Sequence, residues 1–126
     1  MPASVGEFVR LVRASPEGGG LAKVVLFGSV VRGTDGPDSD VDVLVVGVDP
    51  GRLSMAVADA AFEIQMRACV PIEPVVVALD EILPPTSYFV ERVLRTGVEV
   101  FTSEASRALA PHAPRPAPPH RPRNGT

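Results

Sequence analysis

Two aspartates, Asp40 and Asp42, stand two positions apart at the start of an apolar run. On a β-strand, residues i and i+2 point to the same face, so the two carboxylates would lie side by side. Adjacent carboxylates repel each other unless a cation lies between them, and Mg²⁺ is the usual hard cation beside phosphates. The pair therefore indicates a metal site, with ordinary solvated charges at a loop edge as the alternative.

A second candidate element precedes the aspartates. Gly28 and Ser29 follow an apolar run and open a segment that could turn into a helix. Glycine lets a ligand approach the backbone closely, and a helix N-terminus offers free N–H groups and a favourable dipole to phosphate. Ser29 adds a hydroxyl donor, and Arg32 would reach the same anion. The sequence therefore predicts a phosphate-binding turn, although Arg32 could instead pair with a nearby aspartate.

Hydrophobic periodicity predicts the elements that must hold these residues in place. We expect helices over residues 4–14, 52–69 and 86–96, and strands over residues 23–27, 40–46, 72–79 and 98–101. Helices and strands in this order place the chain in the α/β (α+β) class. Pro74 interrupts the third strand, which favours an edge position or a bulge for that strand.

The helix expected over residues 52–69 carries two apolar stripes on opposite sides. Both stripes are covered if the sheet and the C-terminal helix sandwich this helix; otherwise one stripe faces a partner protein. Cys69 is expected to be a buried small hydrophobe. The first stripe comprises Leu53, Val57, Ala60, Ile64 and Ala68, and the second comprises Met55, Ala58, Phe62, Met66 and Cys69.

Composition divides the chain in two. Residues 1–101 carry 8 basic and 14 acidic side chains, enough chain for one compact domain and too acidic for general nucleic-acid binding. Residues 102–126 hold 6 of the 14 prolines and 4 arginines, which predicts a Pro/Arg-rich disordered tail. No apolar run approaches the roughly 20 residues of a membrane span, and the single cysteine and the absence of a leader-like start favour the cytoplasm.

The histidines argue against two other kinds of site. His112 and His120 both lie in the expected tail, so no histidine is available to the folded region. A Ser-His-Asp or Cys-His arrangement is therefore not expected, and neither is a zinc site.

Taken together, the two elements form a longer pattern: Gly-Ser, ten residues, then Asp-x-Asp, with a strand beside each. This pattern closely resembles the signature of the DNA polymerase beta-like nucleotidyltransferase superfamily. The runs LFGSVVRG at residues 26–33 and SDVDVLV at residues 39–45 resemble its minimal nucleotidyltransferases. Those include the MntA-type antitoxins of HEPN/MNT toxin–antitoxin modules.

The resemblance implies the polymerase-beta-like nucleotidyltransferase fold, a small mixed sheet flanked by helices. It also implies an enzyme that transfers a nucleotide with the help of two Mg²⁺ ions and ATP. It makes Asp40 and Asp42 catalytic metal ligands, and Glu73 is the candidate for the third carboxylate that normally completes the site. The family more often has aspartate there, and a surface charge is the alternative for Glu73. The resemblance assigns the phosphate-binding role to Gly28 and Ser29, and Arg32 and Ser39 are our further candidates for nucleotide binding.

The size of the expected domain bears on the acceptor. Residues 1–101 can build a nucleotide site but not the extra helical domain with which larger relatives shape an acceptor pocket. The resemblance therefore implies transfer of AMP from ATP to a tyrosine of a cognate HEPN toxin. Two alternatives stay open: a catalytically weak antitoxin that only binds, and a small-molecule nucleotidyltransferase acting with a separate helical subunit.

Overall fold

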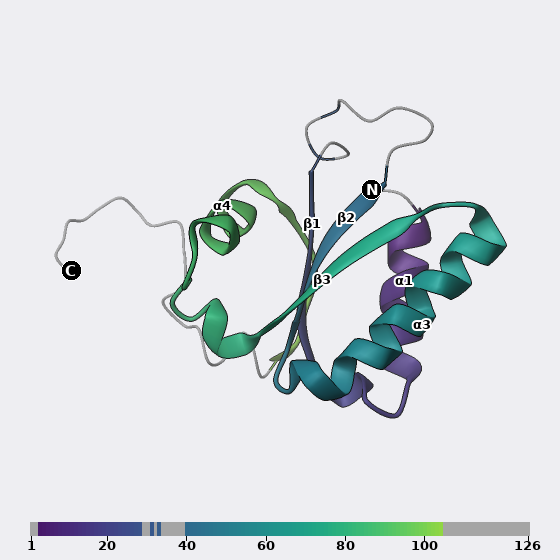
Figure 1. The fold of residues 1–126 in the computed structure, drawn as a ribbon, viewed down its shortest axis with the longest axis horizontal. Helices are drawn as coiled ribbons and strands as arrows, with labels where there is room; N and C mark the ends of the chain where they lie inside the picture. The colour runs from purple at the N-terminus through teal and green to yellow at the C-terminus, as the bar shows by residue number, and fades with distance from the viewer. Residues whose placement is uncertain (1–2, 29–30, 32, 34–39, 105–126) are drawn as a thin grey trace, which may run out of the picture.

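A four-stranded mixed sheet forms the centre of the structure, a computed structural model that describes residues 3–28, 31, 33 and 40–104. The strand order is β3-β2-β1-β4. β1 runs antiparallel to β2 and to β4, whereas β2 and β3 run parallel (Figure 1). The predicted small mixed sheet is confirmed, and the four strands are β1 (Leu21–Phe27), β2 (Val41–Gly47), β3 (Ile72–Ala78) and β4 (Val98–Thr102).

Three described helices flank this sheet, as the periodicity predicts. α1 (Ala3–Ala14) and α3 (Pro50–Ala68) cover one face, and α4 (Tyr88–Thr96) lies against the other (Figure 1). The start of α3 is set by Asp49, whose side chain accepts a hydrogen bond from the backbone N–H of Arg52. The start of α4 is set in the same way by Ser87, whose hydroxyl oxygen accepts a hydrogen bond from the backbone N–H of Val90.

The sheet therefore has a hydrophobic core on each face. Successive strand residues point to opposite faces, so β2 contributes alternately to the two cores. Residues on the first face pack with α1 and α3, and they include the fully buried Val43 and Val45. Residues on the second face pack with α4 and comprise Ala22, Val25, Leu44, Val46, Val77, Ile82, Val90 and Val93.

The position of α4 overturns one expectation for α3. The sheet and the C-terminal helix do not sandwich α3, because they lie on the same side of it, with the sheet between the two helices. The first apolar stripe is buried as predicted, except for Ala68, which is exposed. The second stripe lies in solvent: Met55 is 70% exposed, Phe62 65% and Met66 66%.

Two single residues also differ from expectation. Cys69 is exposed rather than buried, because it ends α3 in the left-handed conformation with a φ of 58°. The amphipathic pattern of residues 86–96 predicts Phe89 on the core side, but it is 43% exposed and packs edge-on against Phe27, with ring centroids 5.5 Å apart. Both differences arise at helix ends, where periodicity alone does not say which neighbours are within reach.

Proline and glycine mark two boundaries of the sheet. β3 is the last strand of the sheet on its side, which confirms the edge position predicted from Pro74. Gly97 ends α4, with an ordinary φ of −82°. A side chain there would lie 2.6 Å from Val25 Cγ1 and 2.8 Å from the Leu26 carbonyl oxygen, so close approach to β1 requires glycine.

An ion-pair cluster on the surface ties α1 to α3. Glu7 accepts from Arg10 within α1 and from Arg67 of α3, at 3.0 Å from Arg67 Nη1. The hydrogen bond from Arg10, followed by the charge of that guanidinium and the contact with Arg67, lowers the pKa of Glu7.

The part of the predicted tail from residue 105 onward lies outside the described residues, while β4 extends the folded domain to Thr102.

Candidate active site at the start of the second strand

Asp42 lies on the strand β2, between one residue of β1 and one residue of β3 that are its partners in the sheet. Its Cα partner on the antiparallel strand β1 is Phe27, and its partner on the parallel strand β3 is Glu73. Neighbouring strands lie about 4.8 Å apart, and alternation puts Asp42 on the same face as Leu44, the face that α4 covers. The structure thus brings two of the three predicted carboxylates, Asp42 and Glu73, side by side.

Asp40 lies immediately before β2 and is exposed. The backbone between the two aspartates is anchored, because the N–H of Val41 donates to the carbonyl oxygen of Pro71 at 2.9 Å. All three carboxylates therefore belong to one end of the β2–β3 pair. Their side chains do not converge as a trio: in the described part of the chain, no group of three His, Cys, Asp or Glu side chains lies close enough to hold a metal ion.

Gly28 forms the wall of this site on the side of β1. Its φ is +85°, in the left-handed region that side chains rarely adopt. A Cβ placed there would collide with a carboxylate oxygen of Asp42 and would lie 3.1 Å from that residue's Cγ. Glycine is therefore required both by the turn and by the closeness of the Asp42 carboxylate to the backbone.

The other residues predicted to bind the nucleotide cannot be placed. Ser29, Arg32 and Ser39 lie outside the described residues. Their predicted roles stay predictions, together with the proposed helix that follows Gly28.

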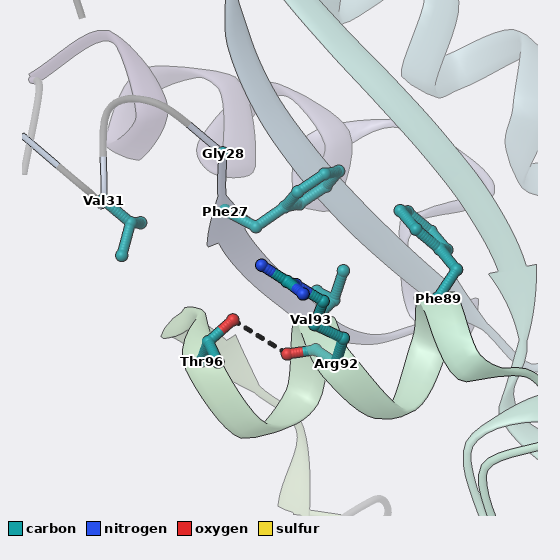
Figure 2. A pocket seen from close by; sticks show the side chains of 7 residues that line it. All are labelled: Phe27, Gly28, Val31, Phe89, Arg92, Val93 and Thr96. Carbon is teal, nitrogen blue, oxygen red and sulfur yellow. Dashed lines mark hydrogen bonds between the residues drawn. The ribbon is translucent and has the colours of Figure 1, made fainter. Parts of the chain in front are cut away.

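A pocket of about 290 Å³ opens beside Gly28, between the end of β1 and α4 (Figure 2). The Arg92 side chain rises from α4 into this pocket toward Phe27 (Figure 2). Arg92 Nη1 donates to the hydroxyl of Tyr88 at 3.3 Å. The residues that line the pocket are Phe27, Gly28, Val31, Phe89, Arg92, Val93 and Thr96.

Sequence reasoning did not single out Arg92, although a signal was present. Arg95 has an acidic residue four positions earlier and pairs with it: Arg95 Nε lies 3.1 Å from Glu91. Arg92 instead has Tyr88 and Thr96 four positions away on either side, so the helix offers it no acidic partner at that spacing. An unmatched arginine on an otherwise paired helix face was the clue.

The oxygen donors at this end of the sheet suit a hard cation. Mg²⁺ and Ca²⁺ prefer carboxylate oxygens, and two such groups on neighbouring strands repel each other without a cation. Asp42 and Glu73 therefore meet the chemical requirement for a divalent metal, with Asp40 exposed at the same end.

Among the described residues, no helix is long and apolar enough to cross a bilayer.

Comparison with known protein families gives one clear match. The profile of the family described as nucleotidyltransferase domain matches residues 10–102, which include β1, β2 and β3. No curated protein sequence matches the chain. The family match covers both Gly28 and Asp42, the residues that form the candidate site.

Solved structures with a similar fold come from toxin–antitoxin complexes. A toxin–antitoxin crystal structure with AMP-PNP has a chain 20% identical, with a TM-score of 0.56, over 85% of this chain and 77% of that one. In the tri-AMPylated Shewanella oneidensis HEPN toxin in complex with MNT antitoxin, the identity is 18% and the TM-score 0.53, over 85% of this chain and 76% of that one. In the toxin–antitoxin MntA–HepT, the identity is 18% and the TM-score 0.52, over 85% of this chain and 77% of that one. These likenesses concern the fold, and the predicted nucleotidyltransferase fold is confirmed.

Replacing Glu73 with glutamine tests the closeness of the two carboxylates. Removing one of two like charges on adjacent strands should raise the free energy of unfolding by about 0.2–1 kcal/mol in EDTA, measured by urea denaturation. Mg²⁺ should stabilise the wild-type protein more than the Glu73→Gln variant. Asp59→Asn, on the exposed side of α3, is the matched control and should change stability by less than about 0.5 kcal/mol in either buffer. Destabilisation by Glu73→Gln in EDTA would contradict the arrangement.

Proposed function

The chain belongs to the nucleotidyltransferase domain family, and we propose that it transfers AMP from ATP to a tyrosine hydroxyl of a cognate HEPN toxin. The observation that carries this proposal is the placement of the Asp42 carboxylate beside the glycine turn at Gly28, on the strand position paired with Glu73. A phosphate group and a divalent cation would meet at this point. The proposal places the protein in the cytoplasm, where ATP is available.

Three residues would hold the metal ions. Asp40, Asp42 and Glu73 supply carboxylate oxygens, the ligands that Mg²⁺ prefers. When bound, the two ions would neutralise charge on the triphosphate and lower the pKa of the attacking hydroxyl. Because the three side chains do not converge as a trio in the described structure, binding requires rotation of the exposed side chains of Asp40 and Glu73 toward Asp42.

The reaction needs one proton acceptor. The acceptor oxygen forms a bond to the α-phosphorus of ATP, the bond from that phosphorus to the bridging oxygen breaks, and pyrophosphate leaves. We assign the proton of the acceptor hydroxyl to Glu73, which is exposed on the edge strand β3. Gly28 and Ser29 are assigned to the phosphates of the nucleotide by the family pattern, and Arg32 and Ser39 are further candidates for nucleotide binding.

Size supports a protein as the acceptor. The described domain is a single sheet with helices on both faces, and its pocket beside Gly28 is at the small end for a ligand site. The pocket holds one ring-sized or phosphate-sized group, and a second substrate must be presented from outside. The fold likeness to chains of HEPN toxin–antitoxin structures supports a HEPN toxin as the partner that presents it.

The exposed stripe of α3 is the surface we assign to that partner. Met55, Phe62 and Met66 form an apolar row that is about two-thirds exposed at each position. Exposed apolar rows of this kind mark interaction surfaces, and methionine adapts readily to a partner. The row lies on the face of the sheet opposite to α4, so partner binding there leaves the pocket beside Gly28 open.

A second function is favoured by one observation. The three carboxylates do not converge as a trio in the described structure, which fits an antitoxin that only binds its toxin and has weak chemistry. The two functions differ in whether neutralisation depends on Asp42.

Intact-mass spectrometry separates them. The protein is mixed with the product of its neighbouring gene, Mg²⁺ and ATP, and we expect the partner to gain one or more AMP units. Asp42→Asn should abolish the gain, and Glu73→Gln should slow it by roughly 10²–10⁴-fold because the general base is lost. A stable complex that neutralises the toxin with no mass gain from any nucleoside triphosphate would contradict the enzyme and favour the binding antitoxin.

Charges placed in the α3 stripe test the partner surface. The double variant Met55→Asp plus Phe62→Asp should lose complex formation in size-exclusion chromatography, because burying two carboxylates against an apolar partner is costly. Both side chains are exposed, so circular dichroism should report an unchanged fold. Asp42→Asn is the control and should retain the complex. A complex that survives the double variant with the fold preserved assigns the contact to another surface.

A further inference from the structure

The pocket beside Gly28 contains a cation that the family pattern did not assign. None of the ion pairs between described residues includes Arg92, whereas Arg95, three residues later, is paired with Glu91. The contact recorded for the Arg92 guanidinium is a 3.3 Å hydrogen bond to the neutral hydroxyl of Tyr88. Its charge is therefore uncompensated by a carboxylate in the described part of the chain.

The charge of Arg92 is accessible from solvent beside an apolar wall. Phe27 and Phe89 meet edge-to-face at 5.5 Å, and Val93 is buried beside them. The Arg92 side chain is itself exposed, so its guanidinium is open to an anion that enters the pocket from solvent. Figure 2 shows Arg92 lying between these rings and Thr96, with its guanidinium held above α4.

The place of the pocket indicates what the anion is. Gly28 lines the pocket and also touches Asp42, so the glycine turn is shared between the carboxylates and Arg92. An anion at the turn would thus have metal-binding carboxylates on one side and a guanidinium on the other. The volume of about 290 Å³ accommodates a phosphate group.

We propose that Arg92 binds the β- and γ-phosphates of the nucleoside triphosphate and holds the pyrophosphate as it leaves. The inference rests on the proposed function, because it concerns the same substrate. Guanidinium and phosphate match in geometry and form paired hydrogen bonds, which suits an arginine better than a lysine at this position. When the bond between the α-phosphorus and the bridging oxygen breaks, negative charge passes to that oxygen, and Arg92 stabilises it from α4.

Binding measurements with nucleotides of different length test the proposal. Isothermal titration calorimetry in Mg²⁺ compares AMP-PNP with AMP on wild-type protein, Arg92→Ala and Arg92→Lys. We expect Arg92→Ala to weaken AMP-PNP roughly 10–100-fold, the loss typical of a charge-assisted hydrogen bond, and to change AMP binding less than twofold. The affinity of Arg92→Lys for AMP-PNP should fall between those of the wild type and Arg92→Ala, because lysine restores the charge without the paired N–H donors of the guanidinium.

Arg95→Ala is the matched control, since Arg95 lies on the same helix and pairs with Glu91 away from the pocket residues. It should leave both nucleotides unchanged. Equal weakening of AMP-PNP and AMP by Arg92→Ala would overturn the inference and assign the pocket to the nucleoside. Unchanged binding of both would also overturn it. In either case wild-type transfer of AMP to the partner would leave the proposed function standing, whereas a wild-type protein that binds no nucleotide in Mg²⁺ would overturn both.

Discussion

The pairing of Asp42 with Glu73 across β2 and β3 is the constraint on which the candidate site depends. Parallel pairing of β2 with β3 fixes them as partners, and a slip of one residue would turn every side chain of β2 to the opposite face. The fully buried Val43 and Val45 prevent that slip, because they would leave the core. The hydrophobic core of the first face thus holds a charged pair together on the second face.

The two faces of the sheet consequently have different tasks. α1 and α3 bury the first face in the larger of the two hydrophobic cores, and the far side of α3 presents an apolar row to solvent. The second face is covered only in part, because α4 spans nine residues and leaves the start of β2 accessible. Gly28 belongs to both parts of the site. Its left-handed backbone lets β1 end beside the Asp42 carboxylate, and it lines the pocket whose other wall is α4.

Local sequence patterns predicted the elements well, since each described strand and helix begins and ends within two residues of expectation. They also predicted the edge position of β3, because proline cannot donate to a central strand. The face occupied by α4 was not predictable in this way. An amphipathic helix with Val90 and Val93 inward fits either face of a sheet equally well, so the choice is made by chain connection and packing. That choice left the second stripe of α3 exposed and placed Arg92 beside Gly28.

The most direct test of the account is a crystal structure of the protein with AMP-PNP and Mn²⁺, in which anomalous scattering locates the metal. We predict an anomalous peak between the carboxylates of Asp40 and Asp42, with Glu73 turned toward it and the triphosphate lying against Gly28. Nucleotide and metal bound anywhere else on the molecule, or a peak that Glu73 and Asp42 do not share, would contradict the account.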